Sequence, residues 1–293
     1  MKKYLYILLC ICLMLICGCN GGDTSSVLSG GPEVSSVVTP VTSSDTVSIS
    51  EESSSEVSTS SEGDTIKQEF DWKTHPEDFK LIAFTFDDAP SYQEPGNNFT
   101  THIIDTLNAY EGAGTLFVTG NSIEKNGIGL LKYAINKNFE IGNHTWHHLH
   151  LPQLDETVIK EEIVSLNNYV EQTLGVTMKF CRPGYIDVDT KVYNVCTELG
   201  MPIVSGNKNK SLLDYSSDTT VEYIIEATYM NAYDGSIILM HGWSEQTAQA
   251  IEEICSTLYA QGYRFVTLSE LFEYKGFNIS YLPTDRIIND TGL

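Results

Sequence analysis

The chain has 293 residues, of which 41% are hydrophobic, and its 39 acidic residues against 17 basic ones give a formal net charge of −22. The phosphates of DNA or RNA would repel so acidic a protein, so nucleic acid is excluded as the expected partner. The length is sufficient for one large α/β domain or two small ones, with enough apolar residues for a core.

The first 19 residues have the pattern of a lipoprotein-type signal peptide. Lys2 and Lys3 precede an apolar run of about 13 residues, which is shorter than the roughly 20 apolar residues that a transmembrane helix needs. The stretch Ile-Cys-Gly-Cys at 16–19 resembles a bacterial lipobox, in which Cys19 would carry the lipid and become the new N-terminus. An uncleaved anchor is the alternative. Both interpretations predict an extracytoplasmic protein held at the cell membrane.

Residues 20–66 are predicted to form a disordered, acidic Ser/Thr-rich linker. They contain too few large apolar side chains to offset the entropy of ordering the chain. A flexible segment of about 45 residues has an r.m.s. span of roughly 35 to 40 Å. We expect a folded domain at 67–275 and a C-terminal tail at 276–293.

From about residue 78, short apolar runs alternate with amphipathic stretches. The stretch that opens at Asp155, and the one that opens with Thr219 and Glu222 as a possible capping box, are typical of helices. Repeated strand-then-helix units predict a parallel sheet, either open or closed into a barrel. The predicted strands are 81–86, 115–120, 139–143, 178–182, 202–206, 236–241 and 263–268.

Polar side chains that suit catalysis stand at the carboxyl ends of several of these runs. In parallel α/β folds the carboxyl ends of the strands share one face, so residues distant in sequence converge there. This convergence predicts a functional site. The residues concerned are Asp87, Asp88, His144, His148, Arg182 and His241.

The aspartate pair and the first and last histidines of HTWHH together predict a metal site. Adjacent carboxylates repel each other, and a cation is the simplest group that would neutralise one of them. Two imidazoles four residues apart and one carboxylate give three protein ligands and leave positions open for water and substrate. A solvated histidine loop is the alternative for 144–150. The two other histidines of this stretch, His147 and His150, are expected to be surface or packing residues rather than ligands.

Arg182 and His241 are predicted to serve proton transfer. Arg182 is one of three arginines in the chain, and a guanidinium beside Asp87 would hold that carboxylate ionised and oriented, as a general base requires. His241 ends an apolar strand on the face of the predicted metal, where it suits a general acid. An ordinary ion pair for Arg182 and a packed core histidine for His241 are the alternatives.

Five short stretches stand in order along the chain. They are TFDD at 85–88, HTWHH at 144–148, RPGY at 182–185, DY at 214–215 and LMH at 239–241. Together they resemble the motifs of the polysaccharide deacetylases, the carbohydrate esterase family 4 that shares the NodB homology domain, over about residues 78–272. The resemblance implies a distorted (β/α) barrel of about seven parallel strands. It also implies metal-dependent removal of acetyl groups from a polymeric sugar by a catalytic domain at 67–275.

The resemblance assigns chemical roles residue by residue. It implies one divalent metal ion, for which zinc is expected and cobalt, nickel or iron are alternatives. The base would take a proton from water made acidic by the metal, and the acid would protonate the leaving amine. The matched metal ligands are Asp88, His144 and His148, and the matched catalytic groups are Asp87 as base, Arg182 beside it, and His241 as the acid tethered by Asp214.

Four further residues are expected to contact the substrate. The main-chain N–H of Tyr185 matches the donor to the developing oxyanion, and Leu239 matches the residue that lines the acetyl pocket. Tyr215 stands where the family usually has Trp and keeps an aromatic groove wall. For Trp146, stacking on a sugar ring and packing in the core are both open.

The chain departs from the family pattern around Tyr185. Gly184 and Ile186 replace a usual Pro and Gly, and Ala89 replaces a usual Gly. Because Gly184 and Ile186 flank the expected oxyanion donor, they could displace it and slow the reaction. The methyl group that Ala89 adds is expected to be tolerated.

The expected function is deacetylation of N-acetylglucosamine residues in peptidoglycan or a related surface glycan by a monomer. The alternatives are an acetylxylan esterase of the same family, which removes O-acetyl groups, and a catalytically impaired glycan-binding member. Non-haem iron oxygenases also use two histidines and one carboxylate, whereas zinc proteases need Glu where Thr145 stands. Cys181, Cys196 and Cys255 are expected to be buried thiols, and one disulfide between two of them is the alternative.

Overall fold

The computed structural model describes residues 71–90 and 98–292. The signal peptide expected at 1–19, the lipidation expected at Cys19 and the linker expected at 20–66 lie outside these residues. Among the residues described, no helix combines the length and the apolar content needed to cross a membrane.

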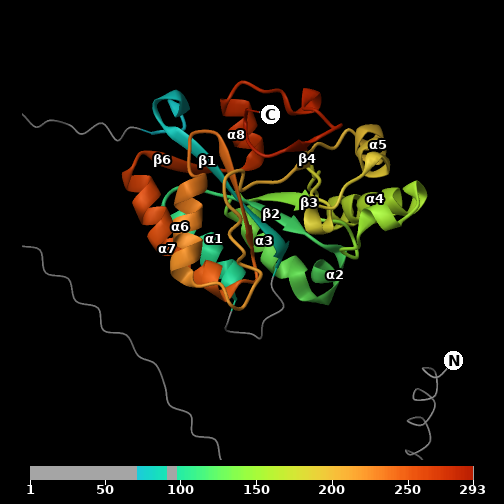
Figure 1. The fold of residues 1–293 in the computed structure, drawn as a ribbon, viewed down its shortest axis with the longest axis horizontal. Helices are drawn as coiled ribbons and strands as arrows, with labels where there is room; N and C mark the ends of the chain where they lie inside the picture. Colours follow the sequence, from blue (N-terminus) through green and yellow to red (C-terminus); the bar gives the residue numbers. More distant parts are fainter. Residues whose placement is uncertain (1–70, 91–97, 293) are drawn as a thin grey trace, which may run out of the picture. The chain divides into compact units, whose positions relative to one another are not determined.

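The main sheet contains five parallel strands with β1 at its centre (Figure 1). β5 pairs with residues 82–87 of β1, whereas β6 pairs with 80–83 and β2 with 85–89, so β6 and β2 share the opposite edge of β1. β3 pairs with the outer edge of β2. The strands are β1 (Lys80–Ala89), β2 (Thr115–Val118), β3 (Glu140–Asn143), β5 (Ser236–His241) and β6 (Tyr263–Val266).

A second pair of parallel strands, β4 (Ile203–Val204) and β7 (Ile287–Ile288), continues the sheet into a barrel. Cys181 forms a bridge to β3 on one side and to β4 on the other, and Asp290, just after β7, bridges to the start of β5. The strand order therefore runs from β5 through β1, β2, β3 and β4 to β7 and returns to β5. The expected α/β fold, a distorted (β/α) barrel of parallel strands, is confirmed.

Two segments differ from their predicted structure. Residues 178–182, predicted as a strand, contribute only the bridge at Cys181. The ladder stops there because Pro183 has no N–H to donate, and the carbonyl of Val204 accepts a hydrogen bond from the Arg182 side chain instead. Residues 276–293, expected to be a tail, include β7, whose two residues are too few for a strand pattern to be visible.

Helices surround the strands. Figure 1 shows α1, α6 and α7 grouped on one side of the strands and α4 and α5 on the other. The α-helices are α1 (Phe99–Ala109), α2 (Gly120–Ser122), α3 (Ile128–Asn136), α4 (Glu156–Leu174), α5 (Thr190–Leu199), α6 (Val221–Asn231), α7 (Glu245–Ala260) and α8 (Leu268–Tyr274). The shorter helical turns are η1 (Pro76–Asp78), η2 (Ile123–Gly127), η3 (Leu151–Gln153), η4 (Gly184–Ile186) and η5 (Ile279–Tyr281).

The helix starts follow the predicted capping residues closely. Asp155 is the N-cap of α4, although its side chain makes no capping hydrogen bond. The N-cap of α6 is Thr220, one residue after the predicted Thr219, and its hydroxyl accepts from the N–H of Tyr223.

Alternation along β1 divides the core into two clusters. Ile82, Phe84 and Phe86 pack with apolar side chains of the surrounding helices. Leu81 and Ala83 pack instead in a second cluster, made mainly of side chains from the other strands inside the barrel and from α8. Up to Asp87, the parity of a β1 residue therefore determines the side on which it packs, whereas Ala89, after the register shift, packs in the helix-side cluster. The three cysteines of the described residues, Cys181, Cys196 and Cys255, are buried free thiols.

Candidate active site

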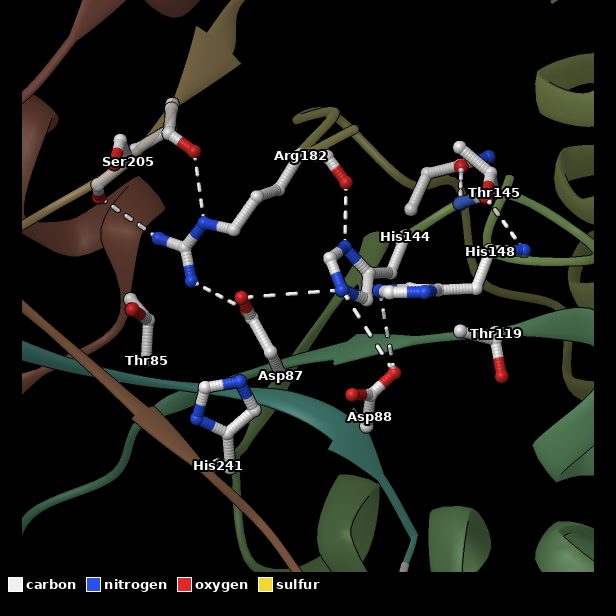
Figure 2. Close-up of polar contacts among 12 residues, drawn as sticks. Thr85, Asp87, Asp88, Thr119, His144, Thr145, His148, Arg182, Ser205 and His241 are labelled. Carbon is white, nitrogen blue, oxygen red and sulfur yellow. Dashed lines mark hydrogen bonds and ion pairs between the residues drawn. The ribbon is translucent and has the colours of Figure 1, made fainter. Parts of the chain in front are cut away.

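Asp87 and Asp88 leave β1 in different directions. Asp87 has the same parity as the interior residues of the strand and is only 3% exposed. Asp88 has a φ of +55°, and the pairing with β2 shifts register at this point, so its side chain turns outward and is 30% exposed. Figure 2 shows the two carboxylates at the end of β1 facing different partners.

Arg182 holds Asp87 from inside the barrel. Its Nη1 donates to Asp87 Oδ1 at 2.6 Å, and its Nε and Nη2 donate to the carbonyls of Val204 and Ser205 at 2.8 Å each. The guanidinium is fully buried and lies 4.0 Å from the centre of the Phe117 ring. These contacts compensate the buried positive charge and fix the plane of the guanidinium.

Asp87 is ionised in spite of its burial. Burial alone would raise the pKa of this carboxyl, but the charges of Arg182, His144 and His241 outweigh that effect and lower the pKa. A single hydrogen bond from Arg182 occupies Oδ1, while Oδ2 lies 3.9 Å from Nε2 of His144. One oxygen of the carboxylate thus faces the other site residues.

Asp88, His144 and His148 form a group that could hold a metal ion, with their ligand atoms within 4.8 Å of one another. Nε2 of each histidine lies 3.8 Å from Asp88 Oδ1. His144 Nδ1 donates to the carbonyl of Arg182 at 2.5 Å, which leaves the Nε2 lone pair directed at the group. Burial, followed by the charge of His144, lowers the pKa of His148 and favours the neutral imidazole that binds metals. Two nitrogen donors and one oxygen donor fit a divalent transition metal.

The histidine loop adopts a backbone conformation that its own sequence does not favour. Thr145 and His148 have φ values of +68° and +57°. Asn143 Oδ1 accepts from the N–H of Thr145, and the Asn143 amide donates to α4 at the carbonyl of Ile163. The hydroxyl of Thr145 in turn accepts from the N–H of His148. Asn143 was not singled out from the sequence, although its position directly before His144 was a signal.

A second anchor of this loop comes from α4. The buried carboxylate of Glu162 accepts from the main-chain N–H of His147 at 2.8 Å and pairs with its Nδ1 at 2.5 Å. His147, with a side chain that is 55% exposed, pairs with Glu162 rather than joining the metal group, as expected for a surface residue. Glu162 lies inside a helix in a run of acidic residues, and nothing in its sequence context marked it.

His241 and Asp214 form the second polar pair of the site. Nδ1 of His241 lies 2.9 Å from Asp214 Oδ1, and Asp214 Oδ2 accepts from the main-chain N–H of His241 and the hydroxyl of Thr247. Burial alone would lower the pKa of His241, but the hydrogen bond and charge of Asp214, with the charges of Asp87 and Asp88, raise it to about 9. His241 pairs in register with Asp87 across β5 and β1.

These groups open onto one cavity of about 660 Å³. The expected substrate contacts Tyr185, Leu239 and Tyr215 line it, together with Trp243. The cavity lining also includes Asp87, Asp88, His144, His148, Ile186, Ser205, Gly206, Asn207, Ser211, Leu212, Leu213, Asp214 and His241. Arg182 lies beneath this surface.

Trp146 is not brought to the cavity. Its indole packs against the core and makes an edge contact with Tyr169, with ring centres 5.5 Å apart. The indole lies directly against Gly120, where the Cβ of any other residue would collide with it. The Trp146 side chain is therefore closely packed within the protein. Of the two interpretations that the sequence left open for Trp146, the structure favours packing.

Asn207 is a cavity residue that sequence reasoning missed. Its side-chain oxygen accepts from the N–H of Leu239 at 3.1 Å, and its amide donates to the Leu239 carbonyl at 2.6 Å. The Asn207 amide thus replaces a neighbouring strand at the edge of β5. It holds Leu239 in place at the cavity wall.

Comparison with known proteins identifies the family. The family described as polysaccharide deacetylase matches residues 74–204. A peptidoglycan-N-acetylglucosamine deacetylase of Bacillus cereus is 32% identical over 203 residues, which cover 68% of this chain and 92% of the relative. The chain belongs to the polysaccharide deacetylase family.

Further relatives differ from one another in length and in the activity that their names give. A bifunctional xylanase/deacetylase of Pseudobutyrivibrio xylanivorans is 32% identical over 207 residues, which cover 70% of this chain but only 32% of that longer protein. The solved family 4 acetyl xylan esterase of Clostridium thermocellum, in complex with a cobalt ion, is 30% identical with a TM-score of 0.65. That match covers 73% of this chain and 100% of the esterase.

The departures of this polysaccharide deacetylase near Tyr185 leave the turn in a glycine-like conformation. Tyr185 and Ile186 have φ values of +60° and +54°, in the left-handed region that glycine adopts most readily. Ile186 therefore adopts a left-handed conformation that glycine would adopt more readily. No hydrogen bond among the described residues uses the main-chain N–H of Tyr185.

Proposed function

We propose that this protein is a metal-dependent hydrolase that removes acetyl groups from N-acetylglucosamine residues of peptidoglycan or a related extracellular glycan. The observation that carries the proposal is the separation of two adjacent carboxylates. Asp87 is held by Arg182, whereas Asp88 faces His144 and His148. Amide hydrolysis of this type needs both a cation site and a separate ionised base.

Asp88, His144 and His148 would hold one divalent cation. Zinc suits these donors, with cobalt, nickel and iron as alternatives. When bound, the cation would polarise the acetyl carbonyl and lower the pKa of water beside it. The cobalt ion in the solved acetyl xylan esterase supports a divalent cation in general rather than zinc in particular.

Asp87 would act as the general base. Its lowered pKa keeps it ionised, and its Oδ2 faces the metal group while Arg182 occupies Oδ1. The carboxylate is thereby oriented to accept a proton from the attacking water. Arg182 would be a positioning residue, because it contacts Asp87 from the side away from the cavity.

His241 would protonate the leaving nitrogen, since an amine leaves poorly until it is protonated. Asp214 supports this role because it keeps the imidazole charged. The unused N–H of Tyr185 would donate to the carbonyl oxygen as negative charge develops there. Leu239, held at the cavity wall by Asn207, would contact the acetyl methyl group.

The polymer is inferred from relatives and from the leader sequence. The Bacillus cereus relative, a peptidoglycan-N-acetylglucosamine deacetylase, is matched over 92% of its length. The lipobox-like stretch ending at Cys19 supports a membrane-anchored lipoprotein near the cell wall, which would act as a monomer. Acetylxylan is the second candidate, supported by the match to an acetyl xylan esterase over its whole chain. A purely glycan-binding role is disfavoured because the proton-transfer residues keep their mutual contacts.

Acetate release from defined polymers tests the proposal. The full-length protein, purified in detergent, would be incubated with peptidoglycan, chito-oligosaccharides and acetylxylan, each with and without a chelator. We expect release that the chelator abolishes and added zinc restores. Absence of acetate release from every polymer with zinc, cobalt, nickel or iron present would contradict the proposed hydrolase.

A further inference from the structure

Tyr185 presents an exposed aromatic ring at the edge of the cavity. Its side chain is 60% exposed, which is unusual for a large aromatic residue. One face of the ring stacks on the imidazole of His150, with ring centres 3.9 Å apart and planes 9° from parallel. An edge contact joins it to His148, with ring centres 4.5 Å apart. Although His150 covers one face of the ring, the residue as a whole remains 60% exposed.

The ring is held in place from two loops. His150, just before η3, pairs through Nδ1 with Asp187 at 3.0 Å, and Asp187 directly follows η4, which contains Tyr185. Within this turn, the N–H of Ile186 donates to the carbonyl of Pro183. These contacts restrict the ring although much of it is in solvent, and an aromatic side chain fixed before binding loses little entropy on binding.

The position of the ring suits a sugar unit beside the reacting one. Tyr185 flanks the metal group through His148, whereas Tyr215 and Trp243 flank His241, with ring centres 5.8 and 5.6 Å from it. The reacting acetyl group would lie between these two sides. A polymer that crosses the cavity would therefore pass over the Tyr185 ring with its next unit.

The electrostatics of the cavity favour a neutral sugar. Among the described residues that line it there is no lysine or arginine. Two lysines lie in the segment between β4 and α6 that contributes to the lining, and both form ion pairs with other residues. Lys208 pairs with Asp290 at 2.7 Å, and Lys210 pairs with Glu226 at 3.5 Å. Apart from His241, which pairs with Asp214, and the cation proposed at Asp88, the described lining residues offer no positively charged group to pair with a carboxylate or phosphate on a glycan.

We infer that Tyr185, stacked on His150, forms a binding subsite for a neutral pyranose ring adjacent to the acetylated unit, with His150 and Asp187 as positioning residues. The inference rests on the proposed function for the identity of the polymer. The apolar C–H face of the pyranose would pack on the exposed face of the phenol ring. The protein would then recognise oligomers better than single acetylated sugars.

Substitutions at His150 test the subsite. His150→Ala removes the stacked ring, whereas His150→Phe keeps a stacking partner and removes only the ion pair with Asp187. The kcat and KM values would be measured on a small acetyl ester and on chito-oligosaccharides from disaccharide to hexasaccharide. We expect His150→Ala to raise KM for the hexasaccharide by about three- to tenfold more than for the ester, and His150→Phe to recover most of this difference.

A matched control is His75→Ala. His75 is a surface histidine of similar exposure that pairs with Glu77 at 3.4 Å and lies just before the other end of β1. This variant should leave the dependence on oligomer length unchanged. Equal losses on the ester and on all oligomers for His150→Ala would overturn the subsite, as would no loss at all.

Binding separates failure of the subsite from failure of the proposed function. Hexasaccharide binding would be measured by calorimetry for the wild type and both His150 variants, independent of turnover. If the wild type releases no acetate but binds the hexasaccharide more tightly than His150→Ala does, the subsite stands and the hydrolase does not. Equal affinities, or no binding by the wild type, count against the subsite.

Discussion

Arg182 and Asp87 form a buried ion pair between residues 95 positions apart, with Nη1 and Oδ1 separated by 2.6 Å. Both side chains are almost completely removed from solvent. The pair brings the end of β1 together with the segment that follows Cys181.

Replacing Arg182 by Met should destabilise the protein strongly. Removal of one partner leaves the Asp87 carboxylate buried without its counter-charge, which typically costs about 3 to 5 kcal/mol of unfolding free energy. Urea denaturation followed by circular dichroism measures this difference. Arg286→Met is the control, because Arg286 makes only an exposed ion pair with Asp285 and its loss should change stability little. Equal stabilities of the two variants would show that the buried pair is not critical.

The two aspartates should separate metal binding from turnover. Asp88→Asn removes a charged ligand and should weaken zinc binding, whereas Asp87→Asn should retain zinc but lose about 10²- to 10⁴-fold in kcat. Competition with a chromophoric chelator measures the zinc affinity, and acetate release measures kcat. The assignment fails if Asp87→Asn loses zinc as readily as Asp88→Asn does.

Asn143 should influence the metal site without touching the ion. Its side-chain oxygen accepts a hydrogen bond from the N–H of Thr145 and so stabilises the left-handed conformation of that residue. This conformation sets the path of the backbone toward His148. Asn143→Ala should therefore weaken zinc affinity by about 10- to 100-fold, as substitution of residues behind metal ligands commonly does. Asn194→Ala, on the exposed side of α5, is a suitable control and should leave the affinity unchanged. An unaltered affinity in Asn143→Ala would argue against this role.

The stability of the metal-free protein should depend on the ionisation of His241. Its folded pKa of about 9 lies above its ordinary value, so the charged imidazole stabilises the fold. That contribution is complete below pH 6.5 and is lost as the pH rises through about 9. Imidazole NMR signals should show His241 titrating near pH 9.

Asp214→Asn should lower the pKa of His241 and move the loss of stability to lower pH. A bound cation should act in the same direction, because it opposes the negative charges of Asp87 and Asp88 that help to raise this pKa. NMR titrations of the wild type with and without zinc, and of Asp214→Asn, test both statements. A His241 signal that titrates at the same pH in all three would contradict this electrostatic account.

The strands were the most predictable part of the fold. The runs at 81–86 and 236–241 were visible because buried parallel strands are apolar on both sides, and both correspond to observed strands. The segment around Cys181 was predicted as a longer strand than the bridges it forms, and the two-residue β7 was not predicted, because pairing over one or two residues leaves no periodic pattern that fixes its extent. Those contacts depend on neighbours that are distant in sequence.

The site residues named from the motifs largely converge, but their supports did not appear in the sequence. Tyr185, Leu239 and Tyr215 line the cavity with the histidines, whereas Trp146 packs in the core. An indole suits both environments, so composition alone does not decide between them. Glu162 and Asn207 form hydrogen bonds to the main chain of His147 and Leu239. Every residue has a main-chain N–H or carbonyl, so such contacts do not produce a recognisable sequence motif.

What the sequence determined by itself is the chemistry available at the end of β1: two carboxylates after an apolar strand, and imidazoles and a guanidinium at the ends of others. The motif resemblance distinguished the two carboxylates by expected role, and the tertiary structure supplies the physical difference between them. Asp87 and Asp88 are chemically identical neighbours, and their difference comes from the turn of the backbone at Asp88 and from partners contributed by distant segments. Burial beside Arg182 favours a fixed, ionised oxygen, whereas exposure beside two imidazoles favours a ligand for a cation.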